Sequence, residues 1–156
     1  MEFLLIRHGK AEAHGHPEGD AARGLIEKGH RQAERVGKFL VAHDLVPDLV
    51  LTSPLRRARE TAEGFCTSAG IDPPVVQEWL HAMYPENSLQ ELAVYSGTCS
   101  RVAIVGHEPS FSDLVGYILG LEDGCVRVKK ASVILMTIDP PRRGGTLHFN
   151  VWPTMF

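Results

Sequence analysis

Three short apolar runs, each followed by a polar turn and a helical pattern, constrain the fold of this chain more than any other feature. The runs are Glu2–Ile6, Leu49–Leu51 and Arg101–Val105. Apolar runs without polar alternation are typical of strands covered on both faces, as in a parallel sheet. The sequence therefore predicts an α/β fold in which strands feed helices repeatedly.

Amphipathic patterns after these runs predict the helices. From Lys28 to His43 apolar residues recur at helical spacing, which favours a helix lying on a sheet. A second pattern ends at Gly70, and we expect Ser53 to be its N-cap and Pro54 its first residue. A third begins near Pro109 and continues through Leu119.

Two further segments predict the edges of the fold. Residues 10–24 hold three Gly residues and one Pro and show no periodicity, which predicts a surface loop. Val133–Ile138 and Thr146–Val151 are apolar and β-branched and are separated by a Pro-Gly loop, which predicts a hairpin at the sheet edge. We therefore expect a three-layer sandwich, with a mostly parallel central sheet and helices on both faces, as one domain over residues 1–156.

Composition excludes several classes of protein. The net charge is −3, whereas general nucleic-acid binders carry a basic surplus, so we expect no nucleic-acid partner. No apolar run approaches the roughly 18 residues of a membrane span, and the N-terminus shows no leader. The three cysteines form no CxxC pair. We expect a cytoplasmic monomer without a membrane partner.

Arginine and histidine side chains follow all three predicted parallel strands. The tripeptide Arg7–Gly9 (RHG) follows the first, Arg57 lies in the helix after the second, and His107 follows the third. Ligands of open α/β sheets bind outside the carboxyl ends of the strands. These side chains are therefore expected to form one site for an anion.

The RHG motif, the SxxxRAxxT element from Ser53 to Thr61, and the strand-ending His107 together resemble the histidine phosphatase, or phosphoglycerate mutase-like, superfamily. The resemblance covers essentially the whole chain. The short chain and the stretch ARGLIEKG at residues 22–29 look most like the SixA-type phosphohistidine phosphatase branch. The resemblance implies the fold expected above and a phosphatase activity.

The resemblance also implies roles for individual residues. His8 is the expected nucleophile, and Arg7, Arg57 and His107 are expected to bind the phosphoryl group. Phosphoryl transfer needs positioning and neutralisation of oxygen charge, which guanidinium forks supply. Cations beside a buried His8 lower its pKa, and a backbone carbonyl is expected to fix one ring nitrogen. We expect neither a cofactor nor a metal.

Two further residues are weaker candidates. Glu78 is a candidate general acid, although a solvated carboxylate at the end of a strand is an equally good interpretation. Arg23 is a candidate phosphate ligand from the loop, or a solvated charge. His14 and His16 form an HxH pair without a third ligand at metal-like spacing.

Three hypotheses of function remain open from the sequence. The leading one is hydrolysis of phosphohistidine on a protein, such as a histidine-phosphorylated signalling domain. The second is a small-molecule phosphomonoesterase or mutase that acts on a sugar or glycerate phosphate ester. The third, a silent phosphate-binding module, is disfavoured because all four motif residues are intact.

Overall fold

A six-stranded sheet forms the centre of the computed structural model, which describes residues 1–156, and its strand order is β3-β2-β4-β1-β5-β6. Neighbouring pairs among β1 to β4 are parallel, β5 is antiparallel to β1, and β6 is antiparallel to β5. The mostly parallel sheet and the edge hairpin are therefore confirmed. The strands are β1 (Glu2–Arg7), β2 (Leu49–Thr52), β3 (Val75–Val76), β4 (Arg101–Gly106), β5 (Val133–Ile138) and β6 (Gly145–Val151).

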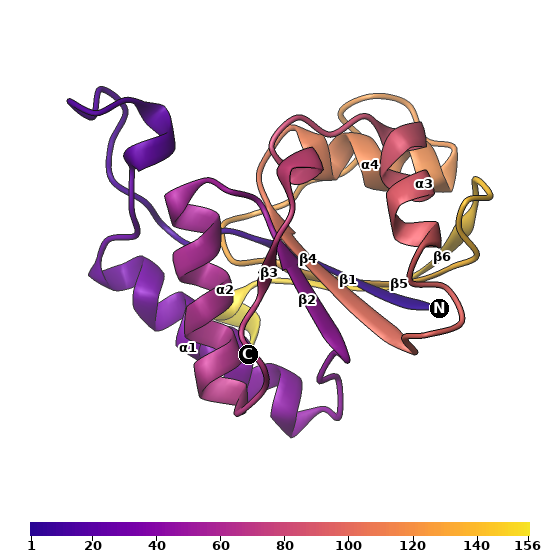
Figure 1. Cartoon of the computed structure of the whole chain (residues 1–156), viewed down its shortest axis with the longest axis horizontal. Coiled ribbons are helices and arrows are strands. Elements are labelled where there is room, and N and C mark those ends of the chain that lie inside the picture. Colours follow the sequence, from indigo (N-terminus) through magenta and orange to yellow (C-terminus); the bar gives the residue numbers. More distant parts are fainter.

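Helices cover both faces of the sheet. Helices α1 (Glu27–Ala42) and α2 (Arg56–Ala69) lie on one face, and α3 (Pro85–Ala93) and α4 (Ser110–Leu119) lie on the other (Figure 1). Because successive side chains of a strand point to opposite faces, fully buried β1 residues enter both cores. Leu4 and Ile6 belong to the cluster that includes α1 and α2 residues, and Phe3 belongs to the other. The predicted three-layer sandwich is confirmed.

The start of α2 differs from the sequence prediction. The helix begins at Arg56, its N-cap is Leu55, and no side chain caps it. Ser53 instead donates its backbone N–H to the carbonyl of Val105 in β4 at 2.9 Å, and its Oγ accepts from the Leu55 N–H at 3.3 Å. The prediction of Ser53 as N-cap and Pro54 as first helical residue was wrong because Ser53 remains hydrogen-bonded to the sheet.

The segment between α2 and β4 contains elements that the sequence patterns did not reveal. Strand β3 has two exposed residues, and α3 has nine residues with a short apolar pattern. Such short elements give little periodicity. Three short 3-10 helices complete the chain: η1 (Asp20–Ala22), η2 (Glu78–Leu80) and η3 (Pro153–Met155).

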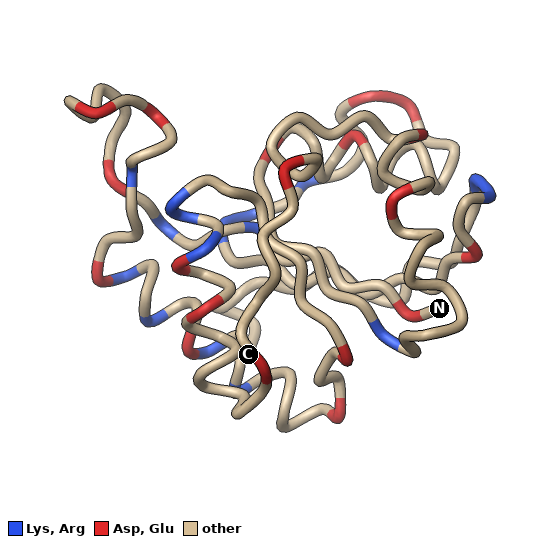
Figure 2. Tube along the Cα trace, viewed as in Figure 1, with Lys and Arg blue, Asp and Glu red and all other residues tan.

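The strand order gathers charged residues at one end of the sheet. Strands β2, β4 and β1 are adjacent and parallel, so their carboxyl ends lie side by side. The amino end of β5 lies there too, because Val133 pairs with Ile6 near the end of β1. Several Lys and Arg positions gather at this end of the sheet, near the first turn of α2 (Figure 2). No helix is both long and apolar enough to cross a membrane.

Candidate active site

His8 lies directly after β1, at the centre of a cavity of about 440 Å³. Its side chain is 3 % exposed, and its Nδ1 lies 2.8 Å from the backbone carbonyl of Gly9. A carbonyl only accepts hydrogen bonds, so Nδ1 carries the proton and Nε2 keeps a free lone pair. The expected fixing of one ring nitrogen by a carbonyl is therefore present, and Nε2 is the nitrogen that carries the lone pair.

The pKa of His8 is lowered to about 3. Burial is the largest cause, followed by the positive charge of Lys130, and Arg57 and Arg7 contribute less. The expected direction and the expected effect of burial are confirmed, but the cation with the largest effect is Lys130, which the sequence argument did not name, and not either arginine. The imidazole of His8 is consequently neutral across the physiological pH range.

Gly9 is required because helix α1 approaches the chain behind His8. A Cβ at Gly9 would lie 2.8 Å from the carbonyl oxygen of Gly29, so a side chain there collides with the α1 backbone. The Gly9 N–H donates to Thr61 Oγ1 at 3.0 Å, and Thr61 donates to the Arg57 carbonyl at 2.7 Å. Thr61 thereby couples the backbone after His8 to the first turns of α2.

Arg7 and Arg57 reach the cavity from β1 and α2. Arg7 Nη1 donates to the carbonyl of Val128 at 2.7 Å, which holds its guanidinium in place. The Nε atoms of both arginines are buried and have no hydrogen-bond partner. Buried polar groups are nearly always paired, and these two donors on cavity-lining arginines are exceptions.

Asp20 of the 10–24 loop occupies the outer side of Arg57. Its Oδ2 accepts from Arg57 Nη2 at 3.0 Å, its Oδ1 accepts from Arg23 Nε at 2.8 Å, and these arginines lower its pKa. Asp20 is therefore ionised. This carboxylate occupies one of the guanidinium donors of Arg57.

His107 and Lys130 complete the cavity on the side of β4 and β5. His107 Nε2 is buried without a partner, and burial, followed by the charge of Arg57, lowers the pKa of His107. Lys130 Nζ lies 3.5 Å from His8 Nε2. Both residues line the same cavity as His8.

The structure thus brings Arg7, His8, Arg57, His107 and also Arg23 to one cavity. Arg23 is 7 % exposed and donates to the Glu12 carbonyl at 2.7 Å, so it is not a solvated charge. The lining residues are Arg7, His8, His14, Asp20, Arg23, Leu55, Arg57, His81, His107, Glu108 and Lys130.

Glu78 lies outside this set. It is exposed, at the start of η2, and does not line the cavity, whereas the nearby His81 does. The carboxylate that the structure places in the cavity is Glu108, whose Oε1 and Oε2 accept from the backbone N–H and hydroxyl of Ser112 at 3.1 and 2.6 Å. Both carboxylate oxygens of Glu108 therefore accept hydrogen bonds from Ser112 in the first turn of α4.

Sequence reasoning missed Lys130 as well as Glu108. The signal for Glu108 is its place beside His107. Lys130 immediately precedes the region of β5, and only the antiparallel pairing of β5 with β1 brings it to the carboxyl end of β1. No group of three or more His, Cys, Asp or Glu side chains is arranged to hold a metal ion.

The chain matches a known protein family and is similar in sequence to several known proteins. Residues 3–83 match the family described as the histidine phosphatase superfamily (branch 1). An uncharacterised protein of Picosynechococcus sp. is 30% identical over 141 residues, covering 86% of this chain and 83% of that protein. A 2,3-bisphosphoglycerate-dependent phosphoglycerate mutase of Mycobacterium tuberculosis is 39% identical over 80 residues, which are 49% of this chain and 32% of the mutase.

Solved structures share the whole fold. The protein histidine phosphatase SixA complexed with tungstate aligns with a TM-score of 0.88 and 20% identity, covering 99% of both chains. A protein of Agrobacterium tumefaciens proposed to be the phosphohistidine phosphatase SixA aligns with a TM-score of 0.82 and 25% identity, covering 97% of this chain and 98% of that one.

Proposed function

The chain belongs to the histidine phosphatase superfamily, and from that premise we propose that it hydrolyses phosphohistidine on a protein substrate through a phosphorylated His8. Support comes from the neutral, oriented imidazole of His8 inside a cavity lined by cations. The similarity to SixA structures supports the same substrate class.

The proposed first step transfers the phosphoryl group to His8. Nε2 attacks phosphorus, the bond from phosphorus to the substrate imidazole breaks, and that imidazole leaves and takes up a proton. Arg7, Arg57 and Lys130 neutralise the three equatorial oxygens, and His107 donates to one of them. Water then attacks phosphorus from the side that the leaving group vacated, which releases phosphate and regenerates His8.

One observation carries the choice of substrate: every carboxylate that lines the cavity is already engaged. Asp20 is held by Arg23 and Arg57, and Glu108 is held by Ser112. An alkyl ester requires a proton on its departing oxygen, whereas an imidazole leaving group protonates readily near neutral pH. A site in which both lining carboxylates already hold hydrogen-bond partners therefore favours a phosphoramidate over an ester.

A substrate comparison tests this proposal. We expect kcat/KM for a histidine-phosphorylated protein to exceed that for 3-phosphoglycerate and a sugar phosphate by about 100-fold, or about 2.7 kcal/mol. The Glu78→Gln variant is measured on the same three substrates. We expect its three kcat/KM values to equal those of the parent protein, because Glu78 is exposed and outside the cavity. Faster ester hydrolysis that Glu78→Gln selectively destroys would replace the proposal with a small-molecule phosphatase.

A further inference from the structure

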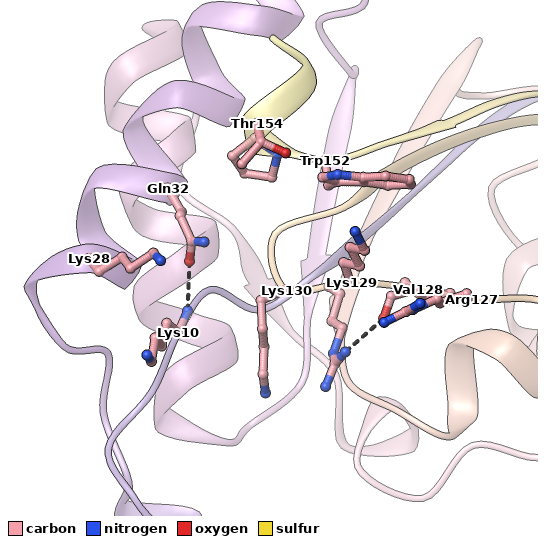
Figure 3. Close-up of a pocket in the computed structure, with 11 residues that line it drawn as sticks. Lys10, Lys28, Gln32, Arg127, Val128, Lys129, Lys130, Trp152 and Thr154 are labelled. Carbon is pink, nitrogen blue, oxygen red and sulfur yellow. Dashed lines mark hydrogen bonds between the residues drawn. The ribbon is translucent and has the colours of Figure 1, made fainter.

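A second cavity, of about 540 Å³, lies beside the first, and basic side chains make up six of the eleven residues that line it. In Figure 3 Lys28 and Gln32 project from α1 on one side, and Lys129 and Trp152 lie on the other. No carboxylate lines it, although the chain as a whole carries a net charge of −3. Its cationic residues are Arg7, Lys10, Lys28, Arg127, Lys129 and Lys130.

The two cavities share a wall. Arg7 and Lys130 line both, and Lys130 Nζ is 3.5 Å from the nucleophilic nitrogen of His8. The bond from Arg7 to the carbonyl of Val128 ties the segment 127–130 to the end of β1 (Figure 3). A ligand in the second cavity therefore lies next to a phosphoryl group on His8, close enough to be part of the same substrate.

The form of the positive charge indicates what the second cavity binds. Lys10 and Lys28 are exposed lysines, and Arg127 is an exposed arginine. Lysine ammonium groups on flexible stems act as separate point charges, whereas an arginine guanidinium can bind one phosphate through two parallel hydrogen bonds. Apart from the shared Arg7 Nε, no buried unpaired donor belongs to this cavity. Several dispersed carboxylates suit it better than a single phosphate.

We propose that this cavity binds an acidic segment of the protein substrate, so that Asp and Glu residues flanking the phosphohistidine dock against Lys10, Lys28, Arg127 and Lys129. This inference rests on the proposed function and adds a determinant of substrate choice to it. The docking raises the local concentration of the phosphohistidine at His8 and lowers KM, and it leaves the chemical step unchanged.

Two synthetic peptides of equal length test the inference. Both carry a central phosphohistidine; one has Asp and Glu on both sides, and the other has Asn and Gln at the same positions. We expect the acidic peptide to be hydrolysed with a kcat/KM roughly tenfold higher or more, through KM, because complementary charge accelerates encounter. Added salt should reduce this preference, since it screens exposed charges.

Variants locate the effect. Lys28→Gln, Arg127→Gln and Lys129→Gln combined remove three charges that line only the second cavity. This triple variant is expected to lose most of the preference for the acidic peptide, because only Lys10 of the four docking residues remains, and to keep the parent rate on the small substrate phosphoramidate. Arg31→Gln, Lys38→Gln and Arg142→Gln combined form the control, which removes three exposed charges outside both cavities and should keep the preference.

Other outcomes would overturn the inference in distinguishable ways. Equal kcat/KM for the two peptides in the parent protein would show that the second cavity is not a docking site. An equal loss of preference in the control variant would show the same. Neither result would contradict the proposed function. A neutral peptide with a phosphoserine beside the phosphohistidine is the third arm, and if it outperforms the acidic peptide, the cavity binds a second phosphoryl group instead. Hydrolysis of esters but of neither peptide would defeat the proposed function itself.

Discussion

At the scale of single residues, the chemistry depends on the burial of His8. A histidine in water is half protonated near its ordinary pKa of about 6.5. Here burial and the charge of Lys130 lower that pKa to about 3, while the Gly9 carbonyl holds Nδ1. In the proposed mechanism the cations that keep His8 neutral also bind the phosphoryl oxygens, so one set of charges acts on both nucleophile and substrate.

His8→Ala is expected to abolish turnover, with a loss on the order of 10⁶-fold, because no neighbouring group replaces a covalent nucleophile. In the parent protein, brief exposure to labelled substrate should leave acid-labile, base-stable label on His8, detected by mass spectrometry. Circular dichroism should show an unchanged fold for the variant. Label on a serine, or on His107, would contradict the assignment.

The titration of Lys130 is expected to set how kcat/KM depends on pH. Its pKa is lowered to about 8, chiefly by burial and then by Arg7, so its ammonium group loses a proton as the pH rises through that value. Phosphate binding then weakens, and kcat/KM, which reports the free enzyme, should fall above about pH 8.

Lys130→Arg keeps its charge at all these pH values and should move this alkaline fall to higher pH. Lys130→Gln should lower kcat/KM at neutral pH and remove the fall. His8 contributes no acidic limb between pH 5 and 7, because its pKa is about 3. A profile with the same alkaline limb in all three proteins would show that another group titrates.

At the scale of elements, the site depends on how closely α1 packs against the chain that follows β1. A Cβ at Gly29 of α1 would lie 2.1 Å from the carbonyl oxygen of Lys10, an overlap that only a shift of backbone relieves. The helix is therefore docked on the segment after His8 with no room for a methyl group. Glycine lowers helix propensity by about 1 kcal/mol relative to alanine, so this contact outweighs propensity.

A pair of glycine-to-alanine substitutions tests whether the close packing at Gly29 outweighs the gain in helix propensity. Gly29→Ala should destabilise the protein by about 1–3 kcal/mol through overpacking and should also reduce kcat. Gly116→Ala in α4 is the matched control: nothing lies within 4 Å of the added Cβ, so it should stabilise the protein by roughly 0.4–1 kcal/mol. Urea unfolding measures both, and a stabilising Gly29→Ala would refute the close packing.

At the scale of the whole molecule, the charge is distributed unevenly. The protein is slightly acidic, yet two adjoining cavities at one end of the sheet together contain Arg7, Arg23, Arg57 and a group of lysines. Such a local positive field attracts anions without making the whole surface basic. The arginines supply positive charge of the kind that a divalent cation provides in other phosphotransfer sites.

Chelation is therefore expected to leave activity intact. Dialysis against EDTA should not change kcat or KM on a phosphohistidine substrate, because side-chain cations already neutralise the phosphoryl oxygens and no cluster of ligands is arranged for a metal ion. The measurement is steady-state kinetics before and after dialysis. Loss of activity that a divalent ion restores would be the contrary result.

The sequence by itself determined the elements whose patterns are local. Apolar runs and helical periodicity predict β1, β2, β4, α1 and α4, because burial imposes those patterns on each segment separately. Because Arg7, His8, Arg57 and His107 follow the carboxyl ends of parallel strands, the sequence also predicted that they share one site. The side-chain roles at that cavity remain predictions until the variants are measured.

Only the tertiary structure decided the rest, because it depends on which distant segments meet. The antiparallel pairing of β5 with β1 brings Lys130 to His8, and the docking of α1 makes Gly9 necessary. The folding of the 10–24 loop onto α2 sets Asp20 against Arg57, and Glu78 stays exposed outside the cavity. The contacts of Lys130, Gly9 and Asp20 join segments that are distant in the sequence. Hydrophobic periodicity describes one segment at a time and therefore does not predict which segments come into contact.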